Sequence, residues 1–253
     1  MKRLWLMLVL ACAAHFDVLA QAPRSGFEFM SPATQALQLD DTLNPAMLWL
    51  KEGEQQWASG SPPAQRACNA CHGDARQSMR GVAARYPAFD ERLQRPVTLA
   101  GRVNECRQRY QQAQALAPES QALLGLETYV AHASRGMPLA PPSDARLASD
   151  RALGQRLFMQ RMGQLNLSCA QCHDQHAGQR LGGSTIPQAH ANGYPSYRLE
   201  WQGLGSLQRR LRNCMSGVRA EPYAFESREL VALELYLAQR GAGLKIETPA
   251  VRP

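Results

Sequence analysis

One five-residue motif occurs twice in the chain and constrains its fold more than any other feature. The copies are Cys68-Asn-Ala-Cys71-His72 and Cys169-Ala-Gln-Cys172-His173, with their first cysteines 101 residues apart. Two thiols about one helical turn apart can add to the two vinyl groups of one haem, and a histidine directly after them can bind its iron. The sequence therefore predicts two covalently bound haem c groups. The thioether cysteines would be Cys68, Cys71, Cys169 and Cys172, and the axial histidines His72 and His173.

Two other roles of paired cysteines fit these motifs less well. A zinc site built from two Cys-x-x-Cys pairs usually separates them by about 15–20 residues, far fewer than the 101 found here. A redox-active dithiol needs no histidine after its second cysteine, yet both copies have one. Haem attachment is thus the favoured interpretation.

The motifs belong to a longer internal repeat. Gly53 and Gly154 each stand 15 residues before the first cysteine of their motif, and a Tyr-Pro pair follows each motif, at Tyr86 and Tyr194. A self-similar spacing of this kind is the signature of a duplicated structural unit. The repeat therefore predicts the same order of elements in each half: a helix, the haem loop, short helices and a final helix.

The final helix of each half has its own signal. The segments 119–131 and 226–238 align without gaps, and their apolar residues recur at helical spacing. Ser120 and Ser227 stand where a serine would cap the helix. Between the halves, residues 137–144 contain three prolines that block helix continuation. The predicted fold is all-α, with two tandem cytochrome c-like domains at residues 21–140 and 141–253.

The N-terminus predicts export. Lys2 and Arg3 precede the apolar run 4–14, and small residues lead to Ala20, so residues 1–20 resemble a cleaved secretory signal peptide that would direct the chain to the periplasm. A lipoprotein signal cut before Cys12 is a less favoured alternative, because the preceding apolar run is short. No other stretch reaches the roughly 20 apolar residues of a membrane span, so none is expected.

The net charge of +7 does not by itself indicate nucleic-acid binding, because the arginines are scattered along the chain. We expect no nucleic-acid partner. A more specific interpretation of the positive charge is that some of these arginines bind anionic groups of a cofactor, a substrate or a partner.

The two remaining cysteines occupy equivalent positions in the repeat. Cys106 and Cys214 each follow the tyrosine of their Tyr-Pro pair by 20 residues, and Arg102 and Arg210 each stand four residues earlier. Because the two cysteines occupy equivalent positions, we expect each to have the same role, as the second axial ligand of its iron. A Cys106–Cys214 disulfide, which an oxidising compartment would also allow, is the less favoured alternative. Other candidates lie too close to the proximal histidine or lack a counterpart in the other half: Met79, Met137, His132, His176 and His190.

Paired Cys-x-x-Cys-His motifs, each followed by a lone cysteine, together with RRLRNCMSGVRAEPY at residues 209–223, resemble SoxA, the dihaem subunit of the SoxAX cytochrome. The resemblance covers almost the whole chain after the signal peptide. It implies an L-cysteine S-thiosulfotransferase of periplasmic thiosulfate oxidation. Such an enzyme joins thiosulfate oxidatively to a cysteine of the carrier SoxYZ, pairs with a monohaem SoxX-like subunit, and passes two electrons to a cytochrome c.

Carried over to this sequence, the resemblance implies a role for each residue of the two Arg–Cys pairs. Cys106 would be the distal ligand of the first haem. Cys214 would be the distal ligand of the second haem, modified to a persulfide and catalytic, and Arg210 would bind the substrate anion. A guanidinium four residues away on a helix lies on the same face as the cysteine and suits the oxygens of a sulfonate. Because Arg102 and Cys106 repeat the same pair, the spacing alone does not identify the catalytic half.

Two other functions remain open at this point. The chain could be a thiosulfate dehydrogenase that couples two thiosulfate ions into tetrathionate without a carrier protein. It could also be a dihaem cytochrome c that only transfers electrons, with Cys214 as an inert ligand.

Overall fold

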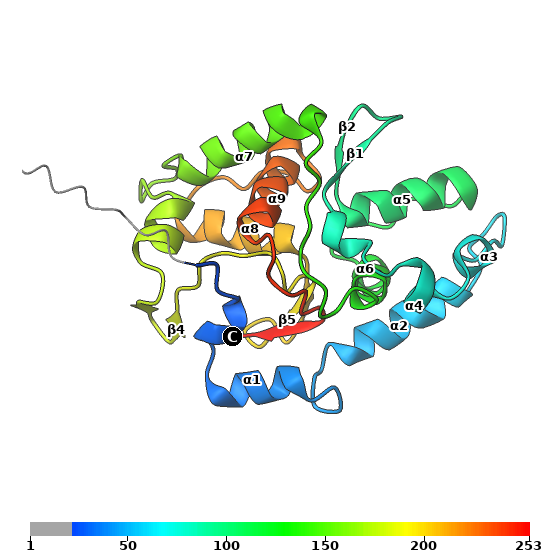
Figure 1. Ribbon diagram of the computed structural model, residues 1–253, viewed down its shortest axis with the longest axis horizontal. Coiled ribbons are helices and arrows are strands. Elements are labelled where there is room, and N and C mark those ends of the chain that lie inside the picture. The colour runs from blue at the N-terminus through cyan, green and yellow to red at the C-terminus, as the bar shows by residue number, and fades with distance from the viewer. Residues whose placement is uncertain (1–21) are drawn as a thin grey trace, which may run out of the picture.

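Helices dominate the computed structural model, which describes residues 22–253 (Figure 1). The predicted signal peptide, residues 1–20, lies outside the described residues. Within residues 22–253, no helix is both long and apolar enough to cross a membrane. We call residues 22–140 the first half and residues 141–253 the second half.

The helices follow the predicted order with two differences. The first half contains α1 (Pro32–Leu39), α2 (Met47–Ala58), α3 (Asn69–His72), α4 (Ala75–Ser78), α5 (Leu99–Tyr110) and α6 (Gln121–His132), with the 3-10 turns η1 (Gly26–Phe29) and η2 (Ala83–Arg85). The second half contains the 3-10 turn η3 (Ala145–Leu147), α7 (Ala148–Met159), the π-helical turn η4 (Gln171–Gln175), α8 (Leu207–Gly217) and α9 (Arg228–Arg240). The helix α1 was not predicted, and α5 and α8, with 12 and 11 residues, are longer than the short helices expected before each final helix. In Figure 1, α7, α8 and α9 lie on one side of the molecule and α2, α5 and α6 on the other.

A pair of closely packed helices forms the frame of each half: α2 with α6, and α7 with α9. A Cβ atom at Gly53 would lie 2.0 Å from the carbonyl oxygen of Gly125, and one at Gly154 would lie 2.0 Å from that of Ala232. Only glycine permits such a close approach of two backbones. The glycine that the sequence repeats therefore marks the point where the two helices touch.

Serine caps hold the ends of the final helices as predicted. The Ser120 side chain accepts a hydrogen bond from the Leu123 backbone amide at the start of α6. Ser227 does the same for Leu230 at the start of α9. Residues 137–144, the proline-rich linker, form no helix. These parts of the sequence-based prediction are confirmed.

The all-α prediction missed three small sheets. The strands are β1 (Ala88–Asp90), β2 (Arg95–Val97), β3 (Arg180–Leu181), β4 (Ser184–Thr185), β5 (Ser196–Arg198), β6 (Gly203–Gly205) and β7 (Ala250–Arg252). Antiparallel pairs join β1 with β2, β3 with β4, and β5 with β6, while β7 runs parallel to β5. Strands of two or three residues are too short to show an alternating pattern, so the sequence contains no signal for them.

The hairpins β1–β2 and β5–β6 lead directly into the helices that carry the lone cysteines. Thr98 caps α5 by accepting a hydrogen bond from the Gly101 amide, and Ser206 caps α8 by accepting one from the Arg209 amide. Both halves therefore build a hairpin, a capping residue and a helix in the same order. The repeat extends to this unit, which positions Cys106 and Cys214.

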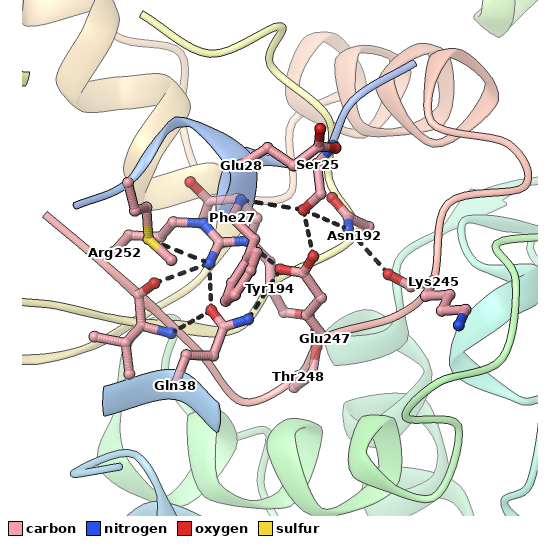
Figure 2. A network of polar contacts seen from close by, with 12 residues as sticks. Ser25, Phe27, Glu28, Gln38, Asn192, Tyr194, Lys245, Glu247, Thr248 and Arg252 are labelled. Atoms are coloured by element: carbon pink, nitrogen blue, oxygen red, sulfur yellow. Dashed lines mark hydrogen bonds and ion pairs between the residues drawn. The ribbon is translucent and has the colours of Figure 1, made fainter. Parts of the chain in front are cut away.

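A buried polar network ties the N-terminal segment to the last strand (Figure 2). The Arg252 guanidinium donates to the Gln38 side chain at 2.5 Å and forms an ion pair with Glu247 at 2.5 Å. The Ser25 hydroxyl donates to Glu247 and accepts a hydrogen bond from Asn192 at 3.1 Å. Among the described residues, the Asn192 side-chain oxygen has no hydrogen-bond partner, but the other hydrogen bonds and the ion pair of the network offset much of the desolvation cost of its burial. It fixes η1 and α1 against β7.

A pocket of about 110 Å³ lies between the halves and is lined by residues of both. Four glutamates border it in two pairs that correspond in the repeat, Glu119 with Glu226 and Glu127 with Glu234. Burial raises the pKa of Glu127 to about 8, and the nearby Glu226 and Glu119 add to the rise. The junction of the halves therefore contains carboxyl groups that hold their protons near neutral pH.

Candidate functional site

The two haem-attachment motifs lie in short turns just after equivalent backbone bridges. An isolated bridge joins Ser61 to Arg66 before the first motif, and another joins Met162 to Leu167 before the second. In the first half the motif forms α3, and in the second most of it lies in η4. None of the cysteines in the described chain forms a disulfide, including Cys106 and Cys214, for which a disulfide was the alternative.

The ring of His173 is oriented by a backbone carbonyl. Its Nδ1 lies 2.7 Å from the Pro187 oxygen, so this nitrogen donates the hydrogen bond and Nε2 remains free as a ligand. Burial lowers the pKa of His173, which favours the neutral form that a metal requires. Sequence reasoning did not find Pro187, because it lies 14 residues beyond the motif.

The setting of His72 is different. Its ring lies 5.7 Å from the Trp57 ring, measured between centroids, and the Trp57 indole donates to the Gly73 carbonyl at 2.9 Å. In the part of the chain that the structure describes, no carbonyl orients His72 as Pro187 orients His173. An aromatic wall thus replaces the carbonyl in the first half.

Helices α5 and α8 bring each lone cysteine beside the attachment cysteine of its own half. Burial raises the pKa of the Cys106 thiol, and the neighbouring Cys68 adds to the rise. Burial raises the pKa of Cys169 to about 11, and Cys214 contributes in the same way. Contacts agree with this placement: the Gln111 side chain at the end of α5 donates to the Cys68 sulfur at 3.5 Å, and Cys169 packs against the apolar cluster that includes Met215 of α8. The structure therefore places each lone cysteine near the attachment motif of its own half.

The surroundings of these cysteines fit haem c. Cys68 packs against a buried apolar cluster that includes Trp57, and Cys169 against one that includes Phe158. An apolar wall, two thiols and a histidine are groups that a covalently attached porphyrin and its iron require, and the lone cysteine of each half could supply the second axial ligand. We therefore regard these residues as the ones that would hold the haem groups.

Arg102 and Arg210 occupy equivalent positions but have different partners. Arg102 forms an ion pair of 2.6 Å with Asp90, whose side chain is 6% exposed, and it donates to the Tyr86 hydroxyl at 3.3 Å. Arg210 lies 3.4 Å from Glu200, whose side chain is 46% exposed. Sequence reasoning missed both carboxylates, because contacts between a hairpin and a helix leave no local pattern.

Arg210 lies close to the second-half cysteine and histidine. Burial alone would lower the pKa of Arg210, but Cys214 and other neighbours raise it overall. The positive charge of Arg210 in turn contributes to the lowered pKa of His173, after burial. The structure therefore brings Arg210, Cys214 and His173 near one another in the second half, and their roles at a haem remain a prediction.

Comparison with known proteins agrees with this geometry. The family model described as "SoxA/TsdA, cytochrome c domain" matches residues 52–139 and 153–246, one segment in each half. These matches define the chain as a c-type cytochrome, a class that binds haem c covalently.

Curated relatives and a solved structure narrow the class to one family. The chain is 37% identical to the L-cysteine S-thiosulfotransferase subunit SoxA of Pseudaminobacter salicylatoxidans, over 90% of this chain and 80% of the relative. It is also 37% identical to SoxA of Rhodovulum sulfidophilum, with the same coverage. The structure of SoxXA from P. pantotrophus superposes with a TM-score of 0.88 at 32% identity, covering 91% of this chain and 87% of that chain. The chain belongs to the SoxA family.

Proposed function

We propose that this chain is the dihaem subunit of an L-cysteine S-thiosulfotransferase of thiosulfate oxidation. It would join thiosulfate to a cysteine of a SoxYZ-like carrier protein. The names of the relatives support the activity. The observation that carries the site assignment is the position of Arg210 one helical turn before Cys214, without a buried carboxylate to neutralise it.

The overall reaction is an oxidation. One carrier thiol and one thiosulfate dianion give a carrier S-thiosulfonate, one proton and two electrons. A sulfur–sulfur bond forms between the carrier cysteine and the outer sulfur of thiosulfate, and no bond of the sulfonate group breaks. When bound, a haem held by Cys169, Cys172 and His173 would supply an iron that accepts electrons one at a time.

The residues of the second half divide the work. The Arg210 guanidinium binds the sulfonate oxygens, because its planar set of donors matches two oxygens at once. The sulfur on Cys214, as thiolate or persulfide, bonds to the outer sulfur of thiosulfate as the two electrons leave. The carrier thiolate then attacks that outer sulfur and releases Cys214 in its original state.

The first half would hold the other haem through Cys68, Cys71 and His72, with Cys106 as its distal ligand. Arg102 is already neutralised by Asp90, so this half has no comparable guanidinium for a substrate anion. We assign it a structural or auxiliary electron-storing role. The domain boundaries at residues 140 and 141, and the count of two haems, are part of the same proposal.

The proposal also includes the partners and the compartment. The similarity to the SoxA chain of the solved SoxXA complex supports a monohaem SoxX-like subunit as the stable partner. A cytochrome c would accept the electrons. Cleavage after Ala20 would deliver the protein to the periplasm, where haem c proteins and sulfur-oxidising carriers meet.

Steady-state assays on the haem-loaded protein with its SoxX-like subunit test the function. Thiosulfate, a SoxYZ-like carrier and oxidised cytochrome c are mixed, and the carrier is followed by intact-mass spectrometry. We expect a thiosulfonate adduct on the carrier cysteine and two reduced cytochromes per adduct. Tetrathionate formation without a carrier would instead identify a dehydrogenase, and no sulfur product at all would identify a simple electron carrier. Intact-mass analysis of the subunit itself would count the haems and locate the signal cut.

A further inference from the structure

The first strand after the Tyr-Pro pair ends in residues of opposite charge in the two halves. Asp90 and Arg198 are both the last residue of the first strand of their hairpin, and each follows the tyrosine of its pair by four residues. A carboxylate in the first half is therefore replaced by a guanidinium in the second. This is a reversal of charge at a position buried in both halves.

In the first half, the buried Asp90 holds Arg102 in an ion pair. The Asp90 carboxylate accepts hydrogen bonds from the backbone amides of Arg92 and Leu93, at 2.8 Å and 2.7 Å, so the hairpin holds it in place. It then pairs with Arg102 at 2.6 Å. The amide of Leu93 and burial act in opposite directions on the pKa of Asp90, which is lowered overall, so the carboxylate is charged. An anion approaching Arg102 would have to displace a fixed, buried carboxylate.

In the second half, Arg198 occupies the position of that carboxylate and draws the nearest acid toward itself. Its Nε donates to the Glu200 carboxylate at 2.8 Å, whereas Arg210 reaches the same oxygen only at 3.4 Å. The Arg198 side chain is 9% exposed and lies over the Trp201 ring, 5.2 Å from its centroid. Buried stacking and the shorter contact both favour the Arg198–Glu200 pair over the Arg210–Glu200 pair.

We infer that Arg198 is the positioning residue that keeps Arg210 available for a small sulfur oxyanion. It occupies the place of a neutralising carboxylate and holds Glu200 away from the Arg210 guanidinium. The inference rests on the proposed function, because it assigns thiosulfate as the anion that Arg210 binds. It also identifies the residue by which the two halves of the repeat differ in substrate binding.

The charge balance around each arginine follows from these contacts. Arg102 and Asp90 sum to zero, and so do Arg92, which is the repeat equivalent of Glu200, and its ion-pair partner Glu105. Arg198, Arg210 and Glu200 sum to +1, and Arg209, whose guanidinium lies 4.2 Å from the centroid of the same Trp201 ring, adds a further positive charge. A dianion is attracted to the second arrangement and not to the first. The position equivalent to Arg209 in the first half is Gly101, which carries no charge.

The test compares thiosulfate KM and binding in variants of the haem-loaded protein with its SoxX-like subunit. Arg198→Asp restores the first-half carboxylate, and we expect it to raise KM for thiosulfate about tenfold while kcat changes less than about threefold. Arg198→Gln should raise KM less, because Glu200 is released but no new charge is added. Glu200→Gln should lower KM. Asp90→Asn, the matched change in the first half, should leave KM within about twofold of the wild type.

Thiosulfate titration by calorimetry without oxidant gives a readout that is independent of turnover. Weaker binding in both Arg198 variants and tighter binding in Glu200→Gln support the inference. An unchanged KM and Kd in the two Arg198 variants, or a KM rise of the same size in Asp90→Asn, overturn it. If Arg198→Asp does not fold, the other two variants still test the inference, because Arg198→Gln should raise KM for thiosulfate and Glu200→Gln should lower it. If the wild type binds thiosulfate but forms no carrier adduct, the proposed function fails while the binding comparison still tests Arg198.

Discussion

Helices α5 and α8 begin with the same capping geometry and carry an arginine and a cysteine at the same positions, yet their arginines differ in availability. Arg102 and Arg210 are each 33% exposed. The partner carboxylate of Arg102 is almost fully buried and 2.6 Å away, and that of Arg210 is exposed, 3.4 Å away and shared with Arg198. Equal exposure therefore does not mean equal reactivity. A charge partner decides whether a guanidinium is structural or free to bind a ligand.

A duplicated scaffold can thus separate two tasks while it keeps its main helices and hairpins. Both halves keep the same helix pair, hairpin and capped helix, so each can position a cysteine opposite its haem-attachment motif. A buried substitution that distinguishes them lies on the first strand of the hairpin before the helix, at Asp90 and Arg198. The predictions below are ordered by the size of the effect and test whether this division holds.

Removal of the second-half cysteine should have the largest effect. Cys214→Ala deletes the sulfur that reacts, and we expect conjugation to fall roughly 10³-fold or more. Cys106→Ala, its matched control, should change the spectrum of the first haem but retain most activity. Both variants are assayed for thiosulfonate on the carrier after their haem content has been measured. Activity lost in Cys106→Ala and kept in Cys214→Ala would show that the halves have been assigned the wrong way round.

The arginines should differ by a smaller factor. Arg210→Lys keeps the charge but loses the two parallel donors, so kcat/KM for thiosulfate should fall about 10- to 100-fold with an unchanged haem spectrum. Arg102→Lys should change kcat/KM by less than about twofold, and instead weaken the contact with Asp90. Similar losses of activity in both variants would contradict the comparison between the two helices.

The two helix crossings should respond alike, because here the halves are the same. Gly53→Ala and Gly154→Ala each place a methyl group 2.0 Å from a backbone oxygen of the facing helix. Each should lower the free energy of unfolding by about 1–3 kcal/mol or more, as other overpacked sites do. Thermal unfolding of the haem-loaded protein measures this. A large loss in one variant and none in the other would limit the symmetry to the haem and cysteine elements.

The carboxyl groups between the halves should give the smallest effect, which depends on pH. The pKa of Glu127 is raised to about 8 by burial and by nearby glutamates, so the folded state binds this proton more tightly than the unfolded state. The stability from this group is fully present below the unfolded pKa of about 4.5 and is lost as pH rises through about 8. Glu127→Gln should therefore become more stable than the wild type as pH rises from 5 to 8, by a few kcal/mol at most.

Urea unfolding at several pH values measures that difference. Glu234→Gln is the matched change in the second half, because the pKa of Glu234 is also raised by burial. A difference between wild type and Glu127→Gln that shrinks with rising pH would contradict the assignment of a protonated carboxyl.

The sequence predicted well those features that depend on spacing along one element. Ser120 and Ser227 cap the expected helices, and Arg102 and Arg210 each lie on the same helix as their cysteine. Such features follow from helical periodicity and from hydrogen bonds between residues three or four apart. The haem-attachment cysteines and histidines rest on the same kind of signal, a fixed local spacing, and their assignment stays a prediction.

Features that depend on contacts between distant segments were not predicted. The carboxylates that pair with Arg102 and Arg210 come from neighbouring hairpins, and the Pro187 carbonyl that orients His173 comes from a loop. The three small sheets join strands too short for a pattern. Aligning the halves does reveal the exchange of Asp90 for Arg198, but only the structure shows that Asp90 pairs with Arg102 and that Arg198 pairs with Glu200.

The network that joins Gln38, Glu247 and Arg252 also has a kinetic consequence. Its hydrogen bonds connect residues more than 200 positions apart, and contacts of such high sequence separation form late, because a long loop must close first. A chain synthesised from its N-terminus reaches β7 last. The helix α1 therefore cannot pack against β7 until that strand has been synthesised.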